Sequence, residues 1–164
     1  MQTDEASRAR LATSADAAEL VRLRALMFES MGVSAADPRW RSACLSFLEV
    51  NLGNSLLIGA VVDAPDGSGL ASGGLANLMV RTPSPSSPTG TLAYLSSMST
   101  DPRWQRMGYG RAVIVRLLQE LEGAGVAQAE LHATSVGERL YRSLGFAERP
   151  GGLEMRIDVG PRRS

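Results

Sequence analysis

Two glycines, Gly108 and Gly110, stand one residue apart in the stretch QRMGYGRAV, directly before an apolar pattern of helical spacing. Glycine in a helix interior costs about 1 kcal/mol relative to alanine, so a glycine pair at the start of a helix needs a reason. A strand, a turn of small residues and a helix start bring unpaired main-chain N–H groups to one point, ahead of the positive end of the helix dipole. The stretch therefore predicts a phosphate-binding turn, with a tight strand-to-helix turn that binds nothing as the alternative.

The remaining chemically reactive residues are few. The chain has one histidine, His132, and one cysteine, Cys44, which are too few for a zinc site of histidine and cysteine, so no metal is expected. Cys44 lies in an amphipathic stretch and is interpreted as a small buried hydrophobe. All seventeen basic residues are arginine, which excludes the lysine-dependent P-loop, pyridoxal and kinase sites. No GxSxG stretch indicates a hydrolase.

Length and charge define the broad class. A length of 164 residues with 44% hydrophobic residues predicts a single globular domain over 1–164. Seventeen acidic residues balance the seventeen basic ones, so neither general nucleic-acid binding nor membrane-surface binding is expected. The N-terminal stretch has two acids and no apolar run, and no later stretch has the roughly 18 to 20 apolar residues of a membrane span. We therefore expect a cytoplasmic protein.

The elements that must position the glycine turn follow from hydrophobic periodicity and turn residues. In chain order we predict a strand near 9–12, helices at about 15–31 and 38–52, a strand hairpin around APDGSG, a proline-rich loop RTPSPSSPTG, a strand TLAYLSSMST, a helix at about 108–123, a strand QAELHAT, a short helix in SVGERLYRSL and a final strand near LEMRIDV. Thr13 and Asp16 have capping-box spacing at the start of the first helix. This order predicts an α/β fold with helices on both sides of a mixed sheet.

The glycine turn matches a known consensus. Motif A of the GCN5-related N-acetyltransferases (GNAT) reads Q or R, two variable residues, G, one variable residue, then G or A, and residues 105–110 of this chain read QRMGYG. The resemblance extends from RLATSADAAELVRLR, which looks like the first strand and helix of the family, to GERLYRSLGF, which looks like its penultimate helix. It implies the GNAT fold, an α/β (α+β) fold with a mixed, mostly antiparallel sheet, helices on both sides and strands that splay apart at the acyl-CoA site.

The resemblance also implies a cosubstrate, acetyl-CoA or another acyl-CoA, and no metal. The pyrophosphate would bind the amides of residues 106–111, and the pantetheine arm would pair with the end of the preceding strand. The residues implied in this contact are Met98, Ser99, Thr100, Gln105, Arg106, Met107, Gly108, Tyr109, Gly110, Arg111 and Thr134. Thr134 replaces a frequent asparagine of the family and still offers one hydrogen bond. Valine at position 108 is expected to block the pyrophosphate and leave the fold mostly intact.

Acyl transfer from a thioester to an amine sets three tasks: a donor to the developing oxyanion, removal of an amine proton, and stabilisation of the leaving thiolate. By resemblance, a main-chain amide near Met98 and Ser99 serves the first task. Tyr141 in RLYRSLGF serves the third, because a phenol with a pKa of about 10 is protonated at neutral pH. Packing between helix and sheet is the alternative role for Tyr141.

The base is where this sequence departs from the family. Many members have a glutamate on the strand before motif A, but YLSSMSTD offers no carboxylate before Asp101, which could simply cap or turn. Glu130 and His132 share one face of the next strand, so His132 is the candidate base or substrate contact. Otherwise His132 is structural, or the amine reaches the site already neutral.

The resemblance thus implies an acyl-CoA-dependent N-acyltransferase that acetylates a small-molecule amine by direct attack. A CoA-binding regulatory or structural module without turnover and a protein or peptide N-acetyltransferase are the alternatives, and a homodimer is a further family expectation. Met27, Phe28, Met31 and Trp40 cluster at the junction of the first two helices. They would favour an apolar or aromatic acceptor over a polycation, unless they only fill the core.

Overall fold

The computed structural model describes residues 8–149, 151, 155 and 157. The chain divides into two compact units, Met1–His132 and Ala133–Ser164, and each is considered by itself. The single domain expected over 1–164 stays a prediction. The strand expected near LEMRIDV falls mostly outside the described residues. None of the described helices is long and apolar enough to cross a membrane.

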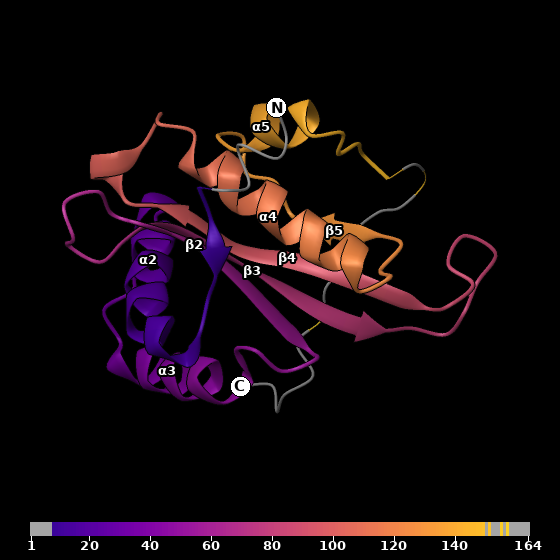
Figure 1. The fold of residues 1–164 in the computed structure, drawn as a ribbon, viewed down its shortest axis with the longest axis horizontal. Coiled ribbons are helices and arrows are strands. Elements are labelled where there is room, and N and C mark those ends of the chain that lie inside the picture. Colours follow the sequence, from indigo (N-terminus) through magenta and orange to yellow (C-terminus); the bar gives the residue numbers. More distant parts are fainter. Residues whose placement is uncertain (1–7, 150, 152–154, 156, 158–164) are drawn as a thin grey trace. The chain divides into compact units, whose positions relative to one another are not determined.

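The first unit is built around a five-stranded sheet (Figure 1). Its strands, β1 to β5, are Arg10–Leu11, Leu57–Asp63, Leu70–Val80, Thr91–Thr100 and Ala129–Leu131, and they lie in the sheet in chain order. The pairs from β1 to β4 are antiparallel, whereas β5 pairs parallel with β4. The predicted mixed, mostly antiparallel sheet is confirmed.

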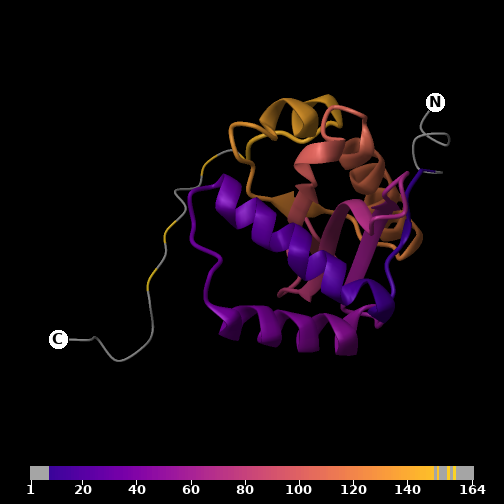
Figure 2. The ribbon, with the colours of Figure 1, turned by 90° about the vertical axis from the view of Figure 1, so that its left-hand side faces the viewer.

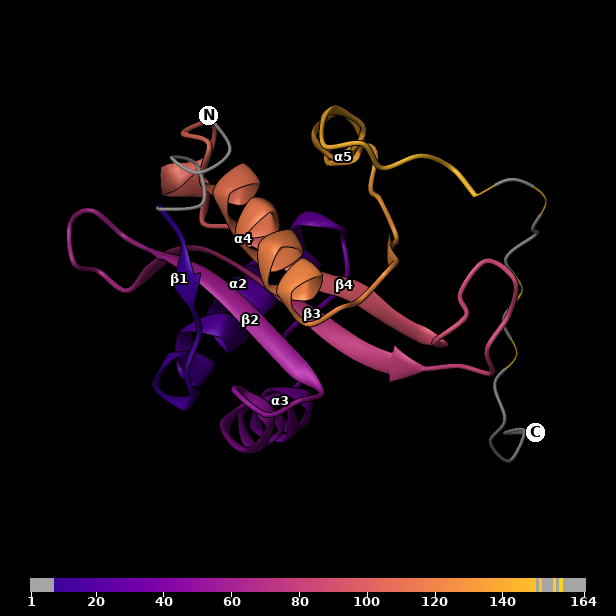
Figure 3. The same cartoon turned by 45° about the vertical axis from the view of Figure 1, so that its right-hand side comes forward.

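Helices cover both faces of this sheet. Helix α4, Tyr109–Gly123, packs across β2 and β3 (Figure 3). Helices α2, Ala17–Ser30, and α3, Pro38–Asn51, run side by side on the other face (Figure 2). Two short 3-10 helices, η1 at Ser14–Asp16 and η2 at Pro102–Trp104, precede α2 and α4. In the second unit, helix α5 covers Glu138–Ser143.

Two consecutive glycines of β3 show how closely both layers approach the sheet. A Cβ atom on Gly73 would lie 2.8 Å from Leu20 of α2, whereas a Cβ atom on Gly74 would meet Met98 of β4 and lie 3.0 Å from Val113 of α4. Neighbouring residues of a strand point to opposite faces, so the two helix layers lie on opposite sides of β3. The apolar face predicted for α4 is the buried one, as expected for an amphipathic helix on a sheet.

Three predicted boundaries need correction. The helix expected at 15–31 begins with the 3-10 turn η1, although the capping box of Thr13 and Asp16 is present. The helix expected at 38–52 ends at Asn51. The strand expected in QAELHAT covers only Ala129–Leu131, because its parallel pairing with β4 ends at the Leu95 and Leu131 pair. His132 and Thr134 therefore lie beyond the strand.

Strand β4 contains a bulge at Ser97. Leu75 of β3 pairs with Ser96, and Gly73 pairs with Ser99, so β4 has one more residue than β3 over this interval. Ser97 takes up the extra residue with a left-handed φ of 56°. Such a bulge bends its strand and redirects the side chains on either side of it. Pairing with β5 has already ended at this point, so the outer edge of β4 beyond Leu95 has no strand partner among the described residues.

The turn that follows β4 repeats a tetrapeptide used earlier in the chain. Asp-Pro-Arg-Trp begins α3 at Asp37 and begins η2 at Asp101, and each aspartate accepts the main-chain N–H of the arginine two residues on, at 2.9 and 3.0 Å. The two aspartate side chains differ in exposure, 46% for Asp37 and 5% for Asp101. Asp101 thus has the capping role considered for it, in a buried setting.

Asp101 also ties this turn to α2. Its carboxylate accepts from Arg103 at 3.0 Å and from Arg22 of α2 at 2.7 Å. Hydrogen bonds from Arg103, with a further one from Arg22, hold the pKa of Asp101 well below its usual range despite burial. A carboxyl group so acidic and so fully bonded is a poor general base. It serves to fix the start of the turn that carries the glycines.

We expect Asp101→Asn to lower the free energy of unfolding by about 2 kcal/mol near neutral pH, because an oxygen that accepts from two guanidinium groups becomes an N–H donor. The folded pKa of Asp101 lies below its unfolded value of about 3.9, so its contribution is present above that value and is lost as pH falls. Urea unfolding across the acid range should show a steeper loss for the wild type than for the variant.

Asp37→Asn is the matched control. It removes the same group from the same tetrapeptide at an exposed helix start, so its effect on stability and on the acid slope should be much smaller. Equal losses in the two variants would contradict the role given to the buried carboxylate.

Candidate active site

The glycine turn connects η2 to α4. Gly108 is the N-cap of α4 and has a φ of 82°, a left-handed value that glycine adopts without a Cβ clash. Arg106 has a φ of 65°, also left-handed, which is uncommon for a residue with a side chain. Left-handed residues placed between ordinary ones turn successive amides toward one side, which is the backbone arrangement that binds anions.

The amides of this turn are available for such a ligand. In the described part of the chain, the main-chain N–H groups of residues 106–110 donate to no protein acceptor. The first helical bond comes from Ala112, whose N–H donates to the carbonyl of Gly108 at 3.0 Å. The fifteen residues of α4 add the positive end of their dipole at the same point. The turn thus presents a run of main-chain N–H groups at 106–110 without a protein acceptor in the described part of the chain, and the anion site expected at 105–111 stays a prediction.

A residue that sequence reasoning missed lies beside this turn. The guanidinium of Arg8 donates to the carbonyl of Met107 at 3.4 Å, and its Nη1 is the nearest atom, at 3.6 Å, to a Cβ built on Gly108. Apart from its chain neighbours, no other described residue comes within 4 Å of this Cβ position, so the space before Gly108 has only the Arg8 cation at its margin among the described residues. Nothing in the sequence distinguishes Arg8 from the other arginines, because 99 residues separate it from its contact.

The side chains of the predicted pantetheine strand are already engaged in packing. Ser99 donates to the carbonyl of Leu23 at 2.8 Å, and the hydroxyl of Thr100 lies 2.9 Å from that of Ser72. Met98 packs against Gly74. At Met98–Thr100, the group of β4 left without a strand partner among the described residues is the main chain along its outer edge, and the pantetheine contact expected there stays a prediction.

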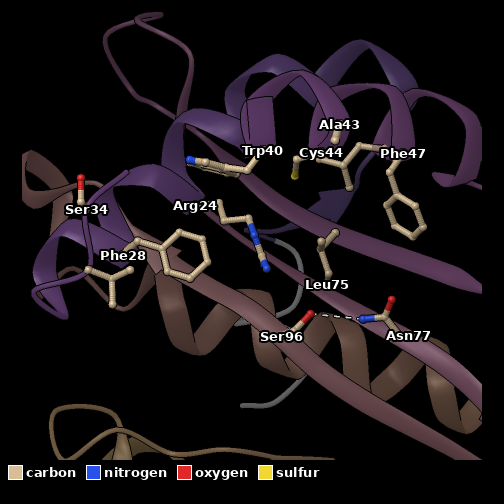
Figure 4. A pocket seen from close by; sticks show the side chains of 12 residues that line it. Arg24, Phe28, Ser34, Trp40, Ala43, Cys44, Phe47, Leu75, Asn77 and Ser96 are labelled. Atoms are coloured by element: carbon tan, nitrogen blue, oxygen red, sulfur yellow. Dashed lines mark hydrogen bonds between the residues drawn. The ribbon is translucent and has the colours of Figure 1, made fainter. Parts of the chain in front are cut away.

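A cavity of about 550 Å³ lies between α2, α3 and the sheet (Figure 4). Its walls include Phe28 and Trp40, whose rings meet edge to face at 5.5 Å. The predicted cluster is confirmed in part, since Met27 and Met31 do not line this cavity and Met31 is 52% exposed. Met31 is the residue directly after α2.

The floor of this cavity comes from the sheet. Leu75 and Asn77 of β3 and Ser96 of β4 line it, and the amide of Asn77 donates to Ser96 at 3.2 Å. Ser96 directly precedes the bulge, so the cavity reaches β4 where its edge becomes open. Cys44 also lines the cavity, and burial raises the pKa of its thiol, which fits its interpretation as a small hydrophobe.

His132 is exposed and directly follows β5. Tyr94 pairs with Glu130 and Leu95 with Leu131, so continuing the register by one residue would set His132 opposite Ser96. That position is on the cavity face of the sheet, although His132 is not among the residues that line the cavity. Glu130, on the same face, accepts from Arg81 at 3.3 Å.

Thr134 and Tyr141 belong to the second unit. The carbonyl of Thr134 accepts from the N–H groups of Gly137 and Glu138, each at 3.0 Å. Tyr141 meets Phe146 edge to face at 5.8 Å, and a Cβ on Gly137 would lie 2.8 Å from its ring. Burial raises the pKa of the Tyr141 phenol, so it stays protonated at neutral pH, as the role expected for it requires.

The described residues contain no group of three or more histidine, cysteine, aspartate or glutamate side chains that could hold a metal ion. The described residues of the candidate site combine a turn of unpaired amides, an open strand edge and an apolar cavity. The mixed sheet covered by helices on both faces defines an α/β protein of the kind the sequence resembles.

Comparison with known proteins agrees with this class. The model of the acetyltransferase (GNAT) domain matches residues 64–148, which is more than half of the chain. The chain therefore belongs to this family, and the predicted family is confirmed. A predicted acetyltransferase from Clostridium acetobutylicum, solved with acetyl-CoA, has the same fold, with a TM-score of 0.79 and 20% identity over 90% of this chain and 94% of that chain.

Two curated relatives match a shorter stretch. The [Ribosomal protein bS18]-alanine N-acetyltransferase of Escherichia coli K12 is 44% identical over 59 residues, which are 34% of this chain and 40% of that protein. Serotonin N-acetyltransferase 2, chloroplastic, of Oryza sativa subsp. japonica is 42% identical over 53 residues, which are 32% of this chain and 26% of that protein. The matched stretches thus span less than half of either relative.

The positive φ of Gly108 changes the expectation for valine at this position, since a β-branched residue would strain the backbone as well as block the turn. Asparagine tolerates left-handed dihedrals and still places a side chain before the open amides. We expect Gly108→Asn to weaken acetyl-CoA binding by about tenfold or more, measured by calorimetry.

Gly125→Asn is the control. Gly125 follows α4 with a φ of 72° and has no atom within 4 Å of a built Cβ, so the change adds the same backbone strain away from the turn. Its acetyl-CoA affinity should equal that of the wild type. Unchanged affinity in a folded Gly108→Asn protein would reject the anion site.

Proposed function

We propose that this chain is an acyl-CoA-dependent N-acetyltransferase that transfers acetyl from acetyl-CoA to the amine of a small molecule. The observation that carries the proposal is the row of amides at 106–110 without a protein acceptor among the described residues, in the turn that follows β4 and its open edge in the chain. Family membership supports it, and so does acetyl-CoA in the Clostridium acetobutylicum structure of the same fold.

The residues of the chain fit this cosubstrate. The open amides and the free space before Gly108 would accept a pyrophosphate, with Arg8 as an added cation. The main chain of β4 at Met98–Thr100 would pair with an extended amide-bearing arm. Acetyl-CoA supplies an activated thioester. A main-chain amide near the bulge would donate to the oxyanion that forms when the amine attacks.

The amine must be neutral to attack, and the cavity favours that state. Its walls are largely apolar. Burial lowers the pKa of an ammonium group. His132 is proposed to remove or relay the amine proton from its position past β5, and Tyr141 is proposed to protonate or hydrogen-bond the leaving thiolate.

The size of the cavity supports a small-molecule acceptor. About 550 Å³ lies within the range of small-ligand sites. Its described lining residues include no acidic side chain and one arginine, so they favour no polycation. The rice relative is named for serotonin, which agrees with a small-molecule acceptor. The Escherichia coli relative is named for an alanine of a ribosomal protein, so a peptide amine is the competing acceptor.

The test is release of free thiol from acetyl-CoA with a panel of amines, with products identified by mass spectrometry. We expect hydrophobic amino compounds to be acetylated with a higher kcat/KM than polyamines or aminoglycosides. A preference for polycations or for peptide N-termini would overturn the small-molecule proposal. Binding of acetyl-CoA without thiol release from any amine would instead indicate a module without turnover.

Tyr141→Phe should lower kcat by about 100-fold and change acetyl-CoA affinity little, because only the proton donor is lost. Tyr94→Phe removes a phenol that has no role in the proposal, and it should leave kcat unchanged. Stopped-flow measurement of the chemical step, with calorimetry for affinity, checks both variants. Normal turnover in Tyr141→Phe would assign the ring to packing alone.

A further inference from the structure

Arg24 is a half-buried cation whose charge has no partner in the described part of the chain. It lies on α2 and reaches among the side chains that line the cavity (Figure 4). Its guanidinium donates to Ser97 and lies 5.0 Å from the centre of the Phe28 ring. No ion pair joins it to a carboxylate, whereas Arg10 and Arg22 each have two.

This arrangement leaves N–H donors of the Arg24 guanidinium unused. A guanidinium has five N–H donors in a planar fork, and Ser97 accepts from one nitrogen of Arg24. A partly buried cation gains most from an anion that takes two donors at once, and a carboxylate has the matching geometry. None of the described residues that line the cavity supplies a carboxylate, so the unused donors of Arg24 are open to the carboxylate of a ligand.

The position of Arg24 relates this anion to the expected reaction. Arg24 bonds to Ser97 at the bulge, and the main-chain segment Met98–Thr100 begins one residue further along β4. Consecutive strand residues are about 3.3 Å apart, so the ends of a small amino acid span this interval. The rings of Phe28 and Trp40 form an apolar wall on the same cavity.

We propose that the acceptor is a small amino carboxylate with an apolar or aromatic side chain, and that Arg24 selects it by pairing with its carboxylate. The proposal rests on the function proposed above. The amine nitrogen forms a bond to the acetyl carbonyl carbon as the C–S bond breaks. The nitrogen loses one proton, the leaving thiolate takes up one, and the products are an N-acetyl amino acid and the thiol of CoA.

The experiment compares substrates that differ only in the carboxylate. With the wild type, phenylalanine and tryptophan should have at least about tenfold higher kcat/KM than phenethylamine and tryptamine. Arg24→Gln should lower kcat/KM for the two amino acids by about 100-fold and leave that for the two amines within about threefold. Arg24→Lys, which keeps a point charge, should recover part of the loss.

Arg41→Gln is the control for general effects of removing an arginine. Arg41 lies 5.5 Å from the ring of Trp40 but does not line the cavity, so the change should leave the preference for carboxylates intact. Calorimetry with acetyl-CoA separates the other reading, in which Arg24 binds the cosubstrate. A loss of acetyl-CoA affinity in Arg24→Gln, with all acceptors affected alike, would overturn the proposal.

Failure of the two proposals gives different results. Absence of thiol release from any amine would refute the transferase itself. Turnover of phenethylamine as fast as phenylalanine by the wild type, or equal losses for both in Arg24→Gln, would leave the transferase in place and refute the selection of a carboxylate.

Discussion

One extra residue in β4 organises the candidate site. Because Ser97 takes up a bulge with left-handed φ, Ser96 and Ser97 both face the layer of α2 and α3, where one lines the cavity and the other accepts from Arg24. The same strand loses its β5 partner after Leu95, so its next residues present an open edge. A cavity on one face and an unpaired main chain on the edge thereby meet at the bulge, which is the geometry that a transfer between two bound groups needs.

The two copies of Asp-Pro-Arg-Trp show that the contribution of a local motif to stability depends on its surroundings. Both copies cap a helix start in the same way, with an aspartate accepting from the amide two residues on. Only the aspartate of the second copy, Asp101, is buried. Its carboxylate also accepts a hydrogen bond from Arg22 of α2, which is distant in the sequence. The turn that leads into the glycines is consequently anchored to another layer of the fold, whereas the start of α3 relies on local contacts.

The chain has no lysine, so its strongly basic side chains are all arginines, and these arginines have different roles. Arg22 neutralises a buried carboxylate, Arg8 borders the open amides, and Arg24, which has no carboxylate partner among the described residues, brings its charge into an aromatic cavity. Arg24 is the one charged side chain among the described residues that line the cavity, so this lining carries a positive charge. A site for polycations would need the opposite sign.

The sequence by itself determined the features that depend on neighbours in the chain. The turn at Gly108 and Gly110, the capping box at Thr13 and the apolar face of α4 could be predicted, because turn dihedrals, caps and helical periodicity are set within a few residues. Tertiary structure alone decided the bulge at Ser97, the burial of Asp101, the end of β5 before His132 and the place of Arg24 beside Ser97. These depend on strand register and on contacts between residues up to 79 positions apart, and hydrophobic periodicity carries no information about which distant side chains meet.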